Sequence, residues 1–135
     1  MTSPTDFRDL RGSNFSNTDL SGCDFHQADL RPLADSSPFA SADSLIRTVF
    51  VDSNLDGANF TDSIASRCVF ISTSARNTNF SGAQLMLADF TDADCTGADF
   101  RGAVLDGTVF AGAVLDDALF DPGVFDTLNR KEVSA

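Results

Sequence analysis

A repeat of five residues constrains this chain more than any other feature. From Thr78 to Phe120, each unit has a small residue, then a polar or apolar one, then Phe, Leu or once Cys. A period of five matches neither the 3.6-residue spacing of an amphipathic helix nor the two-residue alternation of a strand. Such a repeat is typical of a solenoid, in which units bury their apolar residues by stacking on their neighbours. Most multiples of five carry the large residue, from Leu10 to Leu30 and from Leu45 to Phe125.

This pattern resembles the pentapeptide-repeat proteins, whose consensus is a small residue, Asp or Asn, Leu or Phe, and two variable residues. The matching units include TDL at 18–20, ANF at 58–60, and ADF at 88–90 and 98–100. The resemblance implies an all-β fold, a right-handed quadrilateral β-helix with one unit on each side. About five to six coils are expected, with residues 1–125 as a single domain and 126–135 as a short tail or cap.

In a four-sided coil, residues twenty positions apart stack in one column, and Phe recurs here at every tenth position. We therefore predict that two opposite sides bury these rings: Phe50, Phe60, Phe70, Phe80, Phe90, Phe100, Phe110 and Phe120. The other two sides combine leucines with smaller residues, as in a predicted column of Leu45, Ala65, Leu85 and Leu105. All 13 aromatic residues are Phe, which suits a dry core without partners for a hydroxyl or an indole N–H.

Residues 31–42 interrupt the repeat with two prolines and three serines, and we predict a loop insertion there. Phe occurs at positions 15 and 25 before the loop and at multiples of ten after it. Continuous Phe columns would require an odd multiple of five extra residues, most simply five, with Phe39 in a central slot. Two hypotheses stay open, a tolerated surface insertion and a partner-contacting loop.

The net charge of −11 and the pI of about 4.1 argue against direct binding to a nucleic acid backbone. They favour basic partners or mimicry of a nucleic acid. The candidate acidic partner face consists of Asp89, Asp92, Asp94, Asp99, Asp116 and Asp117. The opening residues contain no apolar run, so we expect neither a secretory signal nor a membrane anchor, and a cytoplasmic location.

The sequence offers no convincing catalytic group. His26 is the only histidine and falls on an outward position, whereas the three cysteines fall on inward ones. Neither a zinc-type Cys/His spacing nor a phosphate-binding GxxxxGK[ST] loop is present. We expect no enzymatic activity, no cofactor and no metal.

Apolar residues replace polar ones at the outward place before the central residue in the last units. The resulting candidate dimer collar consists of Val104, Val109, Val114, Leu119, Val124 and Phe125. A second copy of the chain or the C-terminal tail would cover it; alternatively, β-branched residues simply suit the extended backbone. We favour a homodimer through this end. In the tail, Pro122 and Gly123 predict a turn, and Asp126 or Thr127 a helix cap.

Two functional hypotheses follow. The chain resembles the quinolone-resistance type of pentapeptide-repeat protein, which implies a non-enzymatic, acidic DNA mimic that binds DNA gyrase and protects it from inhibitors. The alternative is a passive scaffold or adaptor that presents an apolar corner to a protein partner, without a topoisomerase role. That predicted corner, with Arg47 and Arg67 beside it, consists of Ile46, Val49, Val51, Ile64, Val69, Ile71, Met86 and Leu87.

Overall fold

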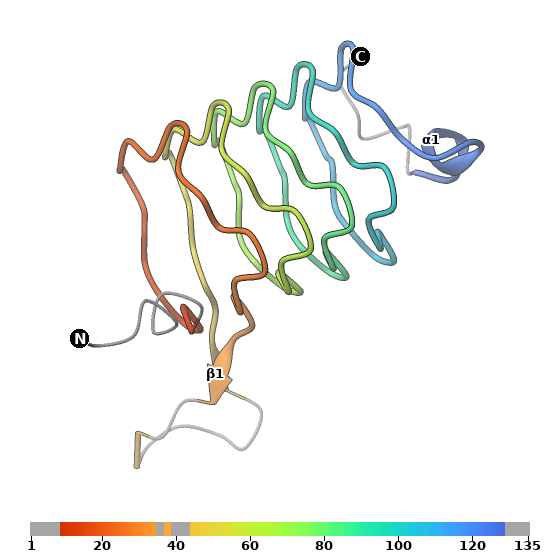
Figure 1. Ribbon diagram of the computed structural model, residues 1–135. Coiled ribbons are helices and arrows are strands. Elements are labelled where there is room, and N and C mark those ends of the chain that lie inside the picture. The colour runs from red at the N-terminus through yellow and green to blue at the C-terminus, as the bar shows by residue number, and fades with distance from the viewer. Residues whose placement is uncertain (1–8, 35–36, 39–43, 129–135) are drawn as a thin grey trace.

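The computed structural model describes residues 9–34, 37–38 and 44–128, and the chain in it winds into a stack of coils (Figure 1). Within these residues, regular secondary structure consists of strand β1 (Leu33–Ala34), strand β2 (Leu45–Ile46) and helix α1 (Val124–Thr127). β1 and β2 pair antiparallel, with Leu33 opposite Ile46. The coils themselves are joined by isolated parallel bridges.

The bridges give each coil four sides. Residues twenty positions apart pair in the later coils, as Val49 pairs with Val69. The amide of Phe50 donates to the carbonyl of Val69 at 2.7 Å, and the amide of Val69 donates to the carbonyl of Thr48 at 3.0 Å. The bridging residues are Asn14, Val49, Val69, Asp89 and Val109 on side 1; Asp19, Asn54, Ser74, Asp94 and Val114 on side 2; Asp24, Asn59, Asn79, Asp99 and Leu119 on side 3; Asp9, Asp29, Ile64, Gln84 and Val104 on side 4.

The phenylalanines behind sides 1 and 3 form the centre of the core. Rings stack along each column, as Phe50 on Phe70 with centroids 5.1 Å apart and planes 3° apart. Rings of the two columns meet edge to face, as Phe50 and Phe60 do at 77°. Both arrangements suit the ring quadrupole. All eight predicted rings lie in this stack; Phe120, at its end, is only partly buried.

The corners explain the Asp and Asn of the repeat. Each corner needs a residue with positive φ, and ten described non-glycine residues adopt it besides the glycines. The side chain before the central residue supports the turn, because its oxygen accepts the amide two residues later. Asn54 accepts from Asp56 at 2.9 Å, and Asn79 from Ser81 at 2.9 Å. Such Asx turns favour Asp and Asn there.

The Phe columns continue across the insertion, as predicted. Phe15 stacks on Phe50 with centroids 5.1 Å apart, and Phe25 stacks on Phe60 at 4.6 Å. Asn14 and Val49 pair although they are 35 rather than 20 positions apart, so the insertion adds fifteen residues, not the five predicted. Phe39 lies outside the described residues.

The prediction that Leu45 belongs to an interior column is wrong. The bridge between Asp29 and Ile64 shows that the preceding coil is completed by the unit of Leu30, which is fully buried. Leu45 instead belongs to β2 and is 45% exposed. Leu30 already fills the interior place that was predicted for Leu45. β1 and β2 lie where the insertion leaves the coils, and we call this pair of strands the neck of the insertion.

The repeat also ends earlier than its spacing indicates. Phe125 belongs to α1, and its ring packs on Phe120 with centroids 5.6 Å apart. The helix follows the predicted turn, with Gly123 at the N-cap position and φ of 82°. Neither Asp126 nor Thr127 is the cap, because both already lie inside the helix. α1 lies beside the last coil (Figure 1).

Candidate partner-binding surfaces

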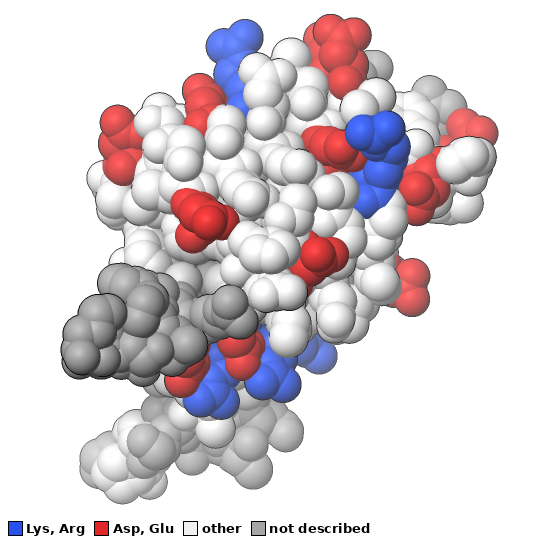
Figure 2. All heavy atoms as spheres, viewed as in Figure 1, with Lys and Arg blue, Asp and Glu red and all other residues white. Residues whose placement is uncertain are grey.

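The predicted acidic residues surround side 2. Asp94 lies on this side, Asp92 at one of its corners, and Asp116 and Asp117 at the other. Asp89 belongs to side 1 and Asp99 to side 3, which face away from each other across the coil. The six carboxylates therefore wrap around one side and onto its two neighbours. Figure 2 shows acidic side chains spread over the surface of the coils.

Only two of these six carboxylates form ion pairs with described residues. Arg101 binds Asp99 through two contacts, Nη2 to Oδ2 at 2.8 Å and Nε to Oδ1 at 3.0 Å. The side-chain hydrogen bond from Arg101 lowers the pKa of Asp99 below its usual value. Asp94 has a longer contact to Arg76, with Nε and Oδ2 3.7 Å apart. No described basic group forms an ion pair with the other four, Asp89, Asp92, Asp116 and Asp117.

The collar surrounds the last coil, but two of its predicted members have another role. The bridging positions of sides 4, 1 and 3 expose Val104, Val109 and Leu119 by 40, 38 and 45%, respectively. Val124 and Phe125 lie in α1 instead, and Phe125 and Leu128 pack against the core. A hollow of about 610 Å³ lies between α1 and the residues around Leu105. The helix thus covers only part of the coil end.

The last coil also presents an open edge. Its amides bond back to the coil before it, as Leu119 donates to Ala98 at 2.9 Å. Among the described residues, no carbonyl accepts the amides of Leu105, Phe110, Leu115 or Phe120. Such an edge is a template for pairing with another chain.

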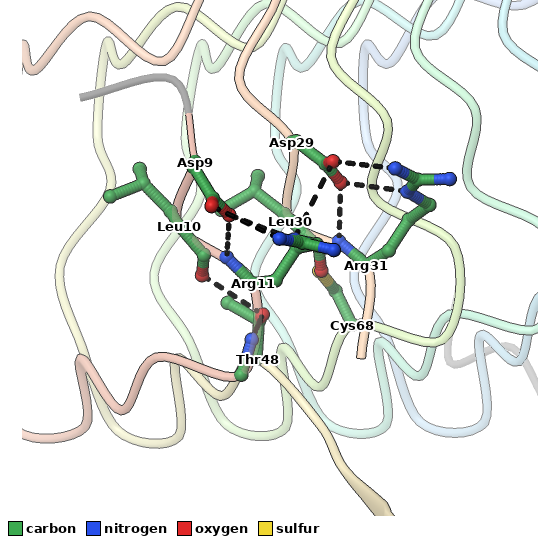
Figure 3. Close-up of polar contacts among 9 residues, drawn as sticks. Asp9, Leu10, Arg11, Asp29, Leu30, Arg31, Thr48 and Cys68 are labelled. Carbon is green, nitrogen blue, oxygen red and sulfur yellow. Dashed lines mark hydrogen bonds and ion pairs between the residues drawn. The ribbon is translucent and has the colours of Figure 1, made fainter. Parts of the chain in front are cut away.

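A cluster of ion pairs that the sequence analysis missed lies in the first two coils. Arg11 Nε binds Asp9 Oδ1 at 2.8 Å, and Arg31 Nη2 binds Asp29 Oδ2 at 2.7 Å (Figure 3). Arg11 Nε also lies 3.8 Å from Asp29 Oδ2 and so joins the two pairs. The side-chain hydrogen bonds from the arginines lower the pKa of both carboxyl groups. The signal in the sequence is an Arg two residues after Asp, as at Asp99 and Arg101.

The predicted apolar corner is not one surface. Ile46, Met86 and Leu87 lie at the corner between sides 4 and 1, from which the insertion leaves the coils. The remaining members belong to other sides and corners: Ile64 to side 4, Val49 and Val69 to side 1, and Val51 and Ile71 to the corner between sides 1 and 2. These columns follow one another around the coil, so the group extends over two sides and two corners instead of lying along a single corner.

The single histidine and the buried thiols make local contacts. His26 Nδ1 lies 2.7 Å from Thr61 Oγ1 and is exposed. The thiol of Cys68 donates to the carbonyl of Leu30 at 3.2 Å (Figure 3), and burial raises the pKa of Cys68 and of Cys95. Within the described ranges, no group of three or more His, Cys, Asp or Glu is placed to hold a metal ion. No helix in the described part of the chain has the length and apolarity needed to cross a membrane.

Several solved structures of pentapeptide repeat proteins are similar to this chain. Rfr23 from the cyanobacterium Cyanothece 51142 is 23% identical, with 85% of this chain and 88% of that chain covered and a TM-score of 0.35. A protein of the Arabidopsis thaliana thylakoid lumen is 25% identical, with coverages of 87 and 74% and a TM-score of 0.36. QnrB1, a plasmid-mediated fluoroquinolone resistance protein, is 20% identical, with coverages of 86 and 64% and a TM-score of 0.45.

The comparison with family models is more informative than these superpositions. No curated protein matches the sequence. The model of the pentapeptide repeat region matches residues 43–120, more than half of the chain, and a second model of pentapeptide repeats matches residues 7–31. Both matches stop where the insertion leaves the coils, in agreement with the stacking of Phe15 on Phe50 across it. The chain belongs to the pentapeptide repeat family.

Proposed function

We propose that this protein is a non-enzymatic protein-binding solenoid whose acidic side 2 binds DNA gyrase in place of DNA and protects the enzyme from inhibitors. The observation that carries the proposal is the placement of Asp92, Asp116 and Asp117 at the two corners of side 2, without ion-pair partners among the described residues. Free carboxylates can meet the basic groups that otherwise hold a phosphate backbone.

The spacing of the coils supports this mimicry. Neighbouring coils repeat at the inter-strand distance of about 4.8 Å, so one column supplies at most one charge in that length. A DNA strand carries one phosphate about every 3.4 Å. The two corners of side 2 carry Asp52, Asp92, Asp56, Asp116 and Asp117 over four coils, which is a density of the same order, and Arg76 interrupts the second corner. Asp52, Asp56 and Asp19 extend the same columns and side toward the N-terminal coils.

The similarity to QnrB1 agrees with the proposal but does not carry it, because the TM-score of 0.45 and the 20% identity are too low for an argument about function. The charges around side 2 of this chain support the proposal instead.

A supercoiling assay tests the proposal. Purified gyrase is inhibited with a fluoroquinolone, and supercoiling is measured with increasing amounts of the protein. We expect the wild type to restore supercoiling and the triple variant Asp92→Asn, Asp116→Asn, Asp117→Asn to restore much less. The matched control, Asp24→Asn, Asp62→Asn, Asp106→Asn, removes three charges away from side 2 and should behave as the wild type. Absence of rescue by the wild type would reject the gyrase role.

The passive scaffold is the second candidate. The observation in its favour is the exposure of Ile46 and Leu87, at 45 and 46%, beside the insertion. A scaffold without a topoisomerase role would leave inhibited gyrase unchanged in the same assay.

We also propose a homodimer through the C-terminal end. The exposed Val109 and Leu119, together with the open amide edge of the last coil, support it. We expect a dimer mass in sedimentation equilibrium for the wild type and a monomer mass for Val109→Asp, Leu119→Asp. The control is the pair Val51→Asp, Ile71→Asp, at two half-buried residues of another corner. An unchanged mass in the collar variant would exclude this seam.

Further assignments of fold, domain bounds, partners and location are part of the proposal. The coils turn in the right-handed sense that the family resemblance implies, and residues 1–125 act as one domain with 126–135 as its tail, with the repeats of this domain ending before α1 (Val124–Thr127). The net charge of −11 supports the absence of direct nucleic acid binding, and the protein works in the cytoplasm without contact to a membrane.

A further inference from the structure

Positive charge gathers at one corner of this acidic molecule, the corner between sides 4 and 1. We name it the arginine corner; it consists of Arg11, Arg31, Arg47 and Arg67. Arg11 and Arg31 lie two residues after Asp9 and Asp29, which are the bridging residues of side 4 in the first two coils. Arg47 and Arg67 lie two residues before Val49 and Val69 on side 1. Figure 2 shows basic side chains gathered at the lower edge of the molecule, where β1 leaves the coils in Figure 1.

The four arginines differ in their partners. Arg11 and Arg31 are held by Asp9 and Asp29, so these four side chains together are neutral. No described acidic group lies within ion-pair distance of Arg47 or Arg67. The two occupy equivalent places in successive coils, because the carbonyl of Thr48 accepts the amide of Val69. Two arginines without an ion-pair partner among the described residues therefore lie one coil apart along this corner.

Exposed apolar residues flank these two arginines. Leu87 follows Arg67 in the same corner column, is 46% exposed, and has φ of 60° as Arg67 has 63°. Ile46 precedes Arg47 and is 45% exposed. Of the seven exposed large apolar residues in the described part of the chain, four lie here or on the neck, namely Leu33, Leu45, Ile46 and Leu87. The other three are Val104, Val109 and Leu119 of the collar.

We propose that the arginine corner is a docking site for an acidic protein segment that also carries leucine-like side chains. Each free guanidinium can hold a carboxylate through two parallel hydrogen bonds. Ile46 and Leu87 offer apolar contacts between and beside these charges. Because salt screens charges over about 8 Å, the corner attracts a carboxylate locally even though the whole chain is negative.

Charge complementarity favours this occupant over two others. A nucleic acid would place many phosphates against a molecule of net charge −11 and would leave the apolar side chains unused. A second copy would bring its own net charge of −11 to this corner, whereas the proposed homodimer forms at the apolar collar of the C-terminal end. A short acidic segment needs only as many charges as Arg47 and Arg67 can pair. The site is independent of side 2 and of gyrase.

A binding titration with a defined probe tests the proposal. The probe is a fluorescent peptide of sequence ELEELEEL, followed by anisotropy at low and moderate salt. We expect saturable binding to the wild type and about tenfold weaker binding to Arg47→Gln, Arg67→Gln, because two charge-assisted contacts are lost. Gln27 has φ of 58° at an equivalent corner place, so Gln fits the backbone of position 67. The control Arg76→Gln, Arg101→Gln removes the same charge elsewhere and should bind as the wild type.

Further arms separate the alternatives. The peptide ESEESEES should bind several-fold more weakly than the leucine peptide, since it lacks the apolar contacts, and a single-stranded oligonucleotide of equal charge should also bind more weakly. Sedimentation of the protein alone should give the same mass for the wild type and Arg47→Gln, Arg67→Gln. The proposal is overturned if the leucine peptide does not bind saturably, or if it binds the arginine variant as tightly as the wild type. It is also overturned if the serine peptide binds as tightly as the leucine peptide, or if the oligonucleotide binds more tightly. A mass change in the arginine variant would identify a second copy as the occupant and would overturn it too.

Discussion

At the scale of single residues, the hydroxyl groups of the inward small positions show how strictly the dry core selects. Thr78 donates to the carbonyl of Leu55 at 2.7 Å, and Thr73 donates to the carbonyl of Phe50. Ser63 is also fully buried, but its Oγ has no hydrogen-bond partner among the described residues. A buried polar group without a partner costs about 1–3 kcal/mol. Ser63 is thus the exception among the buried hydroxyl groups of the described coils.

We predict that Ser63→Ala raises the free energy of unfolding by about 1 kcal/mol, because it removes the unpaired hydroxyl and little volume. Urea denaturation measures the change. The control is Thr78→Ala, which removes a paired hydroxyl and a methyl group and should lower the stability. A loss of stability in Ser63→Ala would show that its hydroxyl does have a partner.

The corner glycines differ in what lies beside them. Gly57 and Gly97 occupy the same corner with φ of 70° and 71°, but a Cβ at Gly97 would lie 2.3 Å from Oδ1 of Asn77, whereas nothing lies within 4 Å at Gly57. We predict that Gly97→Ala is more destabilising than Gly57→Ala, where only the cost of positive φ, about 1–2 kcal/mol, applies. The difference in free energy of unfolding measures the contact.

A second substitution checks the cause. In the background of Asn77→Gly, the Asn side chain is gone, so Gly97→Ala should cost no more than Gly57→Ala. If the excess cost persists without Asn77, the proposed contact is not its source.

At the scale of the repeating unit, the Asp–x–Arg pairs connect local structure to pH dependence. Asp99 is lowered in pKa by the hydrogen bond from Arg101, so the folded state binds its proton less readily than the unfolded state does. The pair therefore stabilises the fold fully above the ordinary carboxyl pKa of 3.8, and the stabilisation is lost as the pH falls through the lower folded pKa.

We predict that Arg101→Gln lowers the stability at pH 7 only slightly, since Arg101 is largely exposed and solvent screens the pair. Below the folded pKa, the variant and the wild type should be equally stable. Denaturation at a series of pH values measures this. A difference between the two proteins that is the same at every pH would contradict the ion-pair explanation.

The sequence predicted the repeating unit well, but it did not predict which charged side chains form ion pairs. The Phe columns were predictable because one period continues through the chain and only a filled column buries these rings. The pairing of Asp99 with Arg101 was missed: an Arg two residues after Asp is the signal, but the corner turn, in which Asp99 also accepts the amide of Arg101, is what brings the side chains together. The placement of Asp89 and Asp99 on opposite sides follows from the four-sided coil. Asp occurs at the same position of several units, however, so the sequence did not indicate which of these carboxylates form ion pairs.

At the scale of the whole molecule, stability depends on contacts between neighbouring coils. Phe80 is fully buried and contacts four rings, with centroid distances from 5.0 Å to Phe60 up to 5.6 Å to Phe70. We predict that Phe80→Ala costs about 3–5 kcal/mol. Each coil contacts only its neighbours, so loss of the Phe80 ring should uncouple the coils before it from the coils after it. The two parts of the stack should then unfold separately.

Hydrogen exchange and thermal melting check this prediction. Amides around residues 60–100 should lose protection before those of the terminal coils. The control is Phe120→Ala, at the partly buried end of the same column, which should cost less. A Phe80→Ala protein that melts as the wild type does would contradict the column assignment.

The insertion limits what could be predicted at this scale. Any odd multiple of five keeps the Phe columns in phase, so the sequence did not separate fifteen extra residues from five. The hairpin of β1 and β2, which takes Leu45 out of the core, decides the number. The arginine corner appears only once the insertion is given its true length, because this brings Arg31 and Arg47 to the same corner.

The central functional claim is that unpaired carboxylates on side 2 replace DNA phosphates on gyrase. The most direct test is the affinity of the protein for purified gyrase as a function of salt. We expect binding that weakens steeply with salt, and a shallower dependence for Asp92→Asn, Asp116→Asn, Asp117→Asn than for the control with three charges removed elsewhere. Equal affinity and equal salt dependence of the two triple variants, or no binding of the wild type, would contradict the claim.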